Sequence, residues 1–301
     1  MSFYLTDQRL GSRTERARRL AETYDGASGW ERVDEYERVM RWRAAHTEGG
    51  AYAASRALGL PRGRIRPWFD GAKPHAQRAI ETAARHGWLD AEPGSRAFEG
   101  LVVLHAWLLA SGSIASETFV PSCVIGTDDP EGLLRAAFDA VGVPSRIVSG
   151  ESDGRTAERR PSGSGGSHLG RFLAGVLGAP VGSKVGVSPA AVQWLESAPR
   201  STRIRWSQTY TVRRGRSLEA RPDGFAVRLG GRCDAAYREA VLAVFGSVVD
   251  DAELTATADA VLLGPKAARC LRRVPTLPPQ SADWDESPPS GNDQPSEPFA
   301  D

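Results

Sequence analysis

Val103–Ile114, with the sequence VLHAWLLASGSI, is the longest dense apolar run in this chain. It ends in Ser111-Gly112-Ser113, which indicates that the helix stops there and that a strand follows directly. Short apolar segments and amphipathic segments alternate after it, and a similar series begins again about a hundred residues later. The run therefore predicts the first of two central helices in a domain that mixes helices and strands.

The alternation predicts the order of elements in two successive stretches. In the first we expect helices at 97–112, 130–141 and 167–178, with strand pairs at 113–126 and at 144–150 and 155–161. A helix-rich segment at 189–214 comes next. The second stretch then repeats the order, with strands at 216–221 and 224–230, a helix at 233–245, strands at 251–256 and 259–264, and a helix at 265–272.

An ungapped shift of 104 residues places Ile125-Gly126 on Leu229-Gly230 and Val141-Gly142 on Phe245-Gly246. We therefore expect an α+β fold with a pseudo-two-fold repeat of an αββαββα unit, repeat 1 at about 97–178 and repeat 2 at about 201–272. An internal repeat removes the need for a second chain, so we expect a monomer with internal pseudo-symmetry.

The composition of the 301 residues is typical of a soluble globular protein, with 41% hydrophobic and 25% charged residues. No stretch approaches the roughly 18 apolar residues of a membrane span, and the N-terminal residues lack an apolar signal core. Three widely separated cysteines, Cys123, Cys233 and Cys270, form neither a disulfide framework nor a metal knuckle. We expect a cytoplasmic protein with no membrane partner.

The formal net charge of +1 conceals an uneven distribution. Residues 274–301 hold six acids and no Lys or Arg, and the remainder holds 38 basic against 31 acidic residues. All but three of the basic residues are Arg, whose planar fork suits phosphates and guanine edges. A GC-rich genome also produces Arg in place of Lys. For the Pro-, Ser- and Asp-rich segment 274–301 we expect a disordered acidic tail.

Residues 50–71, GAYAASRALGLPRGRIRPWFDG, resemble a helix-turn-helix within a helical domain at 1–92. Gly59 falls where the tight turn needs a permissive backbone, and Pro61 suits the first turn of the second helix. Leu60, Ile65 and Trp68 have the spacing that buries this helix. Pro67 disfavours α conformation at Arg66, so we expect a kinked or shortened second helix. A linker at Asp90–Ser95 would end the domain.

The basic residues of this segment are candidates for DNA contact. We expect Arg62, Arg64 and Arg66 on the exposed recognition helix, with Arg56 and Lys73 placed for phosphates. The alternative is an ordinary helical hairpin whose arginines face solvent.

Leu104–Gly112, LHAWLLASG, resembles the LAGLIDADG motif of homing endonucleases, and Leu169–Val185 resembles the stretch that joins the two repeats of that family. The second motif would lie at Ile204–Gly215. The resemblance covers about residues 97–272. It implies two motif helices packed side by side, with Ala106, Ala110, Ser207 and Thr211 as the small residues at their contact, and two curved sheets that lie on DNA as a saddle.

The same resemblance implies a carboxylate at the end of each motif helix, where the family holds the divalent ions that activate water. Ser111 and Arg214 stand at these positions here. We therefore expect a domain that binds DNA and has lost cleavage, with no catalytic residues, no metal site and no cofactor. Glu117, Asp128 and Asp129 are the nearby acids, and their simpler interpretation is as strand-end and helix N-terminal residues.

The predicted strands supply further arginines for a duplex. They are Arg146, Arg155, Arg159, Arg160, Arg216, Arg221, Arg228 and Arg232. The chain is thus expected to be a sequence-specific double-stranded DNA-binding protein that regulates transcription. Two alternatives stay open: an active Mg²⁺-dependent homing-type endonuclease, and an interaction module that does not bind DNA. His105, within the apolar run, is expected to be a buried structural histidine.

Overall fold

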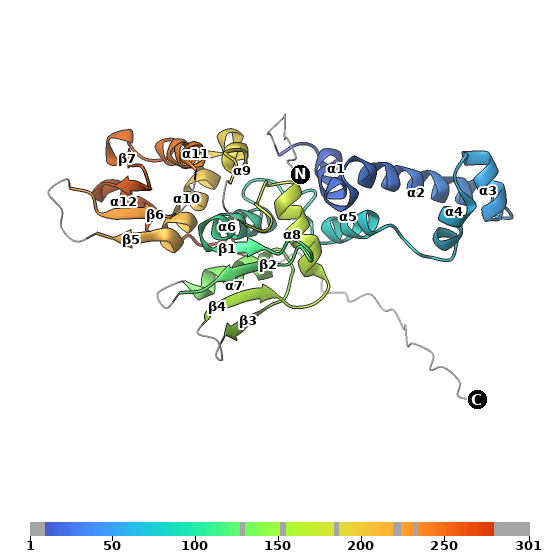
Figure 1. Cartoon of the computed structure of the whole chain (residues 1–301), viewed down its shortest axis with the longest axis horizontal. Coiled ribbons are helices and arrows are strands. Elements are labelled where there is room, and N and C mark those ends of the chain that lie inside the picture. Colours follow the sequence, from blue (N-terminus) through green and yellow to red (C-terminus); the bar gives the residue numbers. More distant parts are fainter. Residues whose placement is uncertain are drawn as a thin grey trace.

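The computed structural model describes residues 10–126, 130–150, 155–183, 187–218, 224–231 and 234–279. The described residues form an α+β fold with two four-stranded antiparallel sheets, which confirms the expected class (Figure 1). No helix in these ranges has the length and apolar character to cross a membrane. The predicted acidic tail lies outside the described residues from position 280 onward.

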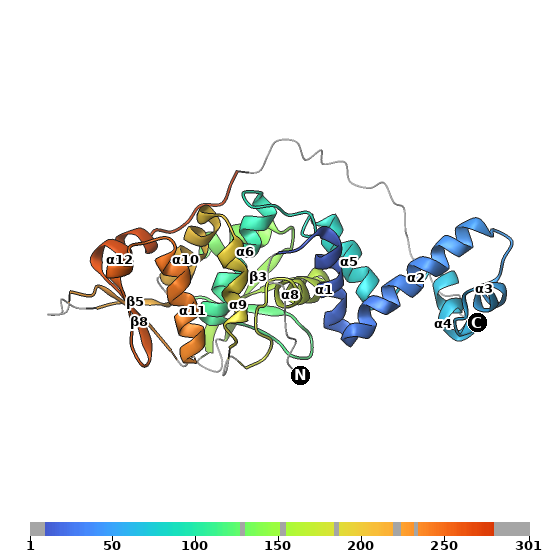
Figure 2. The same cartoon turned by 90° about the horizontal axis from the view of Figure 1, so that it is seen from above.

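The first part of the described chain is helical. Its elements are α1 (Arg13–Asp25), α2 (Ala27–Ala45), α3 (Ala51–Leu58), α4 (Arg62–Phe69) and α5 (His75–Arg85). Figure 2 shows α2 extending away from the rest of the molecule and carrying α3 and α4 at its far end. The helix α4 continues through Pro67, where we expected a kinked or shortened helix, and ends two residues later at Phe69, so it is eight residues long.

The apolar run forms the central helix α6 (Arg96–Ser111), in which every residue from Phe98 to Ala110 is buried. A helix that is apolar on all sides is stable only inside a core. The elements that follow it are β1 (Gly112–Ile114), β2 (Pro121–Val124), α7 (Glu131–Ala140), β3 (Ser145–Gly150), β4 (Arg155–Pro161) and α8 (Gly165–Gly175).

The second half begins with two short helical turns and a second long helix. Its elements are α9 (Ala190–Gln193), the 3-10 turn Trp194–Ser197, α10 (Arg200–Arg214), β5 (Gly215–Ser217), β6 (Val227–Gly230), α11 (Ala235–Gly246), the 3-10 turn Asp251–Glu253, β7 (Leu254–Ala256), β8 (Ala260–Leu263) and α12 (Pro265–Leu271). The strand orders are β1-β2-β4-β3 and β5-β6-β8-β7. Each sheet therefore has the same order relative to the long helix before it.

Helices α6 and α10 pack against each other at the centre of the molecule (Figure 1). The small residues expected at their contact, Ala106 and Ala110 on α6 and Ser207 and Thr211 on α10, are all buried. Two polar contacts join the helices: Glu99, which is fully buried, pairs with Arg205, and the Trp206 indole donates to Nδ1 of His105 over 3.0 Å. His105 is thus a buried structural histidine.

The main hydrophobic core extends beyond residues 97–272. Ala17 and Leu20 of α1, Ala79 and Ala83 of α5, and Trp88 belong to the same cluster as α6. The Trp88 indole also donates to the carbonyl oxygen of Val141 over 2.9 Å. The linker expected at Asp90–Ser95 therefore does not separate two cores. A second cluster, which includes Tyr36, Ile65 and Trp68, lies between α2, α3 and α4.

The buried His105 makes the stability of the fold sensitive to acid. Burial lowers the pKa of His105 to about 3, partly opposed by the backbone at Leu177 and Ala191. The unfolded value is about 6.5, so the neutral ring stabilises the fold fully above pH 6.5 and this contribution is lost as the pH falls towards 3. We expect the free energy of unfolding, measured by urea titration, to fall more steeply below pH 6 than in His105→Gln, by up to about 1.4 kcal/mol per pH unit.

His46→Gln is the matched control, because His46 is exposed on the surface. Its pH profile should follow the unmodified chain. If the free energy of unfolding depends on pH in the same way in the unmodified chain and in His105→Gln, burial of His105 is not the cause of the acid sensitivity.

Candidate nucleic-acid interface

Helices α3 and α4 are joined by a tight turn at Gly59. Its φ of 68° lies in the left-handed region that glycine adopts without strain, and its N–H donates to the carbonyl of Ser55. The Ser55 hydroxyl donates to the carbonyl of Leu60 over 2.6 Å, which closes the turn. Tyr36 of α2 and Trp68 of α4 meet edge to face at 5.5 Å. The turn and this aromatic contact fix α4 against α2.

The exposed surface of α4 carries two of the three predicted arginines. Arg62 and Arg66 are exposed, and within the described residues neither has an ion pair. They are four residues apart and therefore lie on one face of the helix. Arg64 points the other way, because its Nη1 donates to both carboxylate oxygens of Glu35 at 2.8 Å. Arg64 thus holds α4 to α2 and does not belong to the exposed face.

The two residues predicted to bind phosphates differ in the same way. Arg56 is exposed on α3, whereas Lys73 donates to both carboxylate oxygens of Glu81 over 2.9 and 2.8 Å. The hydrogen bond to Glu81 raises the pKa of Lys73. Lys73 is therefore paired with a carboxylate of the same fold.

The first sheet presents an arginine pair on the face that points away from the core. Cys123 and Ile114 are fully buried on the inner face, so their neighbours along β1 and β2 point outward. On that outer face Arg146 of β3 lies directly opposite Arg160 of β4. Arg160 contacts Glu158 and the hydroxyl of Ser122, whereas Arg146 is exposed and within the described residues has no ion pair.

The second sheet has an equivalent pair on different strands. Val227 and Leu229 of β6 are buried and Arg228 between them faces outward, directly opposite Arg216 of β5. Arg228 pairs with Asp259, and Arg216 is exposed with no ion pair among the described residues. Like charges directly opposite each other on neighbouring strands destabilise a sheet, so each pair is a place where a bound anion would relieve repulsion.

Of the remaining predicted arginines, the structure describes the side chain of Arg159 alone, and this side chain does not join the outer face. Arg159 is buried on the inner face and donates to the hydroxyl of Ser145 over 3.1 Å. Arg155 begins β4, but its side chain lies outside the described residues, as do Arg221 and Arg232.

The ends of α6 and α10 meet at Arg214. Its Nη1 donates to the carbonyl of Ala110 at 2.6 Å, in the last turn of α6, and its Nε donates to the carbonyl of Gly230 at 2.8 Å. The last carbonyls of a helix carry partial negative charge, so a guanidinium there is favourable. Arg214 thus joins α6, α10 and β6, and its donors are directed at backbone oxygens.

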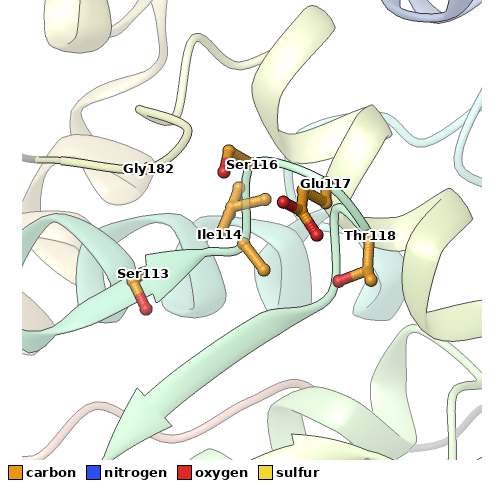
Figure 3. A pocket seen from close by; sticks show the side chains of 7 residues that line it. Ser113, Ile114, Ser116, Glu117, Thr118 and Gly182 are labelled. Carbon is orange, nitrogen blue, oxygen red and sulfur yellow. The ribbon is translucent and has the colours of Figure 1, made fainter.

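The acids near the first motif do not replace the expected carboxylates. Glu117 is exposed on the loop between β1 and β2, beyond Ile114, in an open hollow that Gly182 also lines (Figure 3). It lies past the far end of β1 from Ser111. Asp128 and Asp129 lie outside the described residues. Ser111 and Arg214 offer no carboxylate, and the guanidinium would repel a cation, so these two residues do not fit a divalent metal.

Comparison with models of known protein families, with curated proteins and with solved structures finds no match for this chain.

Removal of the Arg214 donors should destabilise the fold. Arg214→Met keeps an apolar stem of similar length but leaves the carbonyls of Ala110 and Gly230 without this donor. Hydrogen bonds from charged groups contribute about 1.5–3 kcal/mol each, so we expect the free energy of unfolding to fall by about 2–4 kcal/mol in urea titration. Arg216→Ala, two positions further along, should change it by less than about 0.5 kcal/mol. Equal stability of the two variants would refute the role of Arg214.

Proposed function

We propose that this protein binds double-stranded DNA in a sequence-specific manner and regulates transcription. In this proposal α3 and α4 form a helix-turn-helix. The two stretches α6–α8 and α10–α12 form a pseudo-symmetric saddle that resembles a LAGLIDADG domain without nuclease activity. The observation that carries the proposal is the arginine pair on the outer face of each sheet, Arg146 with Arg160 and Arg216 with Arg228.

These pairs support binding of a polyanion. Folding alone disfavours two guanidinium groups opposite each other, yet both sheets carry such a pair. In each pair one arginine contacts an acid, Glu158 or Asp259, and the other stays exposed. The exposed members, Arg146 and Arg216, are the side chains we assign to phosphates or guanine edges. Two twisted antiparallel sheets with such faces suit the major groove of a duplex.

The helical hairpin supports a second contact with the same kind of partner. Arg62 and Arg66 occupy one face of α4, and a recognition helix contacts base edges in the major groove from such a face. Arg56 on α3 is placed for the phosphate backbone. We assign these three arginines to DNA and keep Arg64 and Lys73 as structural residues.

The chemistry at the ends of α6 and α10 supports binding without cleavage. A nuclease of the resembled family needs carboxylates at Ser111 and Arg214, and this chain has a hydroxyl and a guanidinium there. We therefore derive no metal-dependent step. The proposed partner is a DNA duplex bound by a monomer in the cytoplasm, with no cofactor.

The recognition role of α4 predicts a loss of affinity in the double variant Arg62→Ala/Arg66→Ala. The probe is a duplex selected by the full chain from a random-sequence pool, in a fluorescence-anisotropy titration. Each base contact supplies about 1–3 kcal/mol, so we expect affinity to fall at least about tenfold. The control Arg85→Ala/Arg135→Ala removes two exposed charges from α5 and α7 and should change affinity less than about threefold. Equal effects of the two double variants would remove α4 from the interface.

The sheet arginines predict a change in salt dependence. Arg146→Ala/Arg216→Ala should reduce the slope of log K against log salt by about two, because each phosphate contact contributes about 0.9 to it. The same titrations at several salt concentrations measure this slope, and Arg85→Ala/Arg135→Ala should leave it unchanged. An unchanged slope in the sheet variant would place the duplex elsewhere.

Incubation of the selected duplex with Mg²⁺ or Mn²⁺ should produce no nicked or cut product on a denaturing gel. Metal-dependent cleavage would replace the proposal with an active nuclease. Failure to bind any duplex at low salt would favour an interaction module that does not recognise DNA.

A further inference from the structure

Helix α2 belongs to two hydrophobic clusters at once. Val33 in its first half packs with Ala21 of α1 and Ala76 of α5. Tyr36 and Val39 pack with Ala54 of α3 and with Ile65 and Trp68 of α4. These buried positions follow one another within a single continuous helix, so the chain has no loop between the two clusters. The α3–α4 hairpin is therefore attached to α1 and α5 through a rigid element.

Helices α1 and α5 are themselves fixed to the two-sheet part. The guanidinium of Arg171 on α8 lies between two aromatic rings, 3.9 Å from the centroid of Tyr24 on α1 and 3.8 Å from that of Phe119 in the β1–β2 loop. It also donates to the carbonyl of Thr23. A Cβ at Gly175 would lie 2.6 Å from Cγ2 of Thr23, so the two helices approach closely. This contact joins α1, α8 and the first sheet.

The connection thus runs from the first sheet to α4 through packed elements. Arg64 and Glu35 hold α4 to α2, and Lys73 and Glu81 hold the segment after α4 to α5. Figure 1 shows the α3–α4 hairpin at one end of the long axis and the β5–β8 sheet at the other, with the β1–β4 sheet between them. A flexible tether would need a polar or Gly/Ser-rich linker, and α2 is a 19-residue helix.

We infer that the DNA target is a single duplex with two subsites, one for α4 and one for the sheets, at a fixed distance and a fixed helical phase. This inference rests on the proposed function and adds the architecture of the site. Glu35 and Tyr36 contact α4 only two or three residues after Val33 contacts α1 and α5, so α2 holds α4 at one spacing from them.

The test inserts base pairs between the two subsites. The probe is the duplex selected by the full chain from a random-sequence pool, with the subsites located by testing blocks of substituted base pairs for loss of affinity. An insertion of about 5 base pairs, half a helical turn, rotates one subsite to the opposite side of the duplex. An insertion of about 10 base pairs restores the phase but lengthens the separation by a whole turn. We expect both insertions to lower affinity at least about tenfold, because only one subsite can then be occupied.

The variant Arg62→Ala/Arg66→Ala is the control, because it removes the α4 subsite without a change in the buried contacts. It should bind the original duplex and both insertions with the same, weaker affinity. If the unmodified chain binds both insertions within about twofold of the original duplex, the fixed-spacing inference is wrong while DNA binding stands. Recovery at 10 base pairs alone would show a tether that extends and would also overturn it. If the chain selects no duplex, the proposed function fails and the inference fails with it.

Discussion

The packing of α6 against α10 is the constraint on which the rest of the structure depends. Polar groups join the helices at three levels: Glu99 with Arg205, His105 with Trp206, and the carbonyl of Ala110 with Arg214. Burial of a charge such as Glu99 is costly unless it is paired, so these contacts fix one register between the helices. Each sheet starts at the glycine that directly follows its helix, Gly112 or Gly215. The helix pair therefore positions both sheets and, through them, both outer arginine pairs.

The same constraint explains what occupies the ends of the two helices. A pair of parallel helices brings together two sets of C-terminal carbonyls, and their partial negative charges need a donor or a cation. Arg214 supplies a guanidinium that hydrogen-bonds across to α6 and to β6. The positive charge of Arg214 thus stabilises the fold at the ends of the two helices. On the outer faces, by contrast, Arg146 and Arg216 each lie opposite a second arginine and have no ion pair among the described residues, so their charge is exposed to solvent.

The local sequence pattern predicted the helices and strands well, but it did not predict which side chains pair with residues elsewhere in the fold. The apolar run, its terminal glycine and the alternation of short strands predicted helix and strand positions close to those observed, although β6 and β7 are shorter than expected. The turn at Gly59 could be predicted because it depends on the left-handed backbone of this one residue.

Arg64, Lys73 and Arg159 were expected at the surface of the site. Their partners Glu35, Glu81 and Ser145 are separated from them in sequence, and no periodicity encodes such pairs. We predicted a domain boundary at Asp90–Ser95 from its polar composition. In the structure α1 and α5 pack on α8, so one hydrophobic core includes residues on both sides of this segment.

We propose above that one duplex contacts both α4 and the sheets. The most direct measurement is a hydroxyl-radical footprint of the full chain on the duplex it selects. We expect two protected stretches, of which Arg62→Ala/Arg66→Ala loses one and Arg146→Ala/Arg216→Ala weakens the other. A single protected stretch that responds equally to both double variants, or no protection on any duplex, would contradict it.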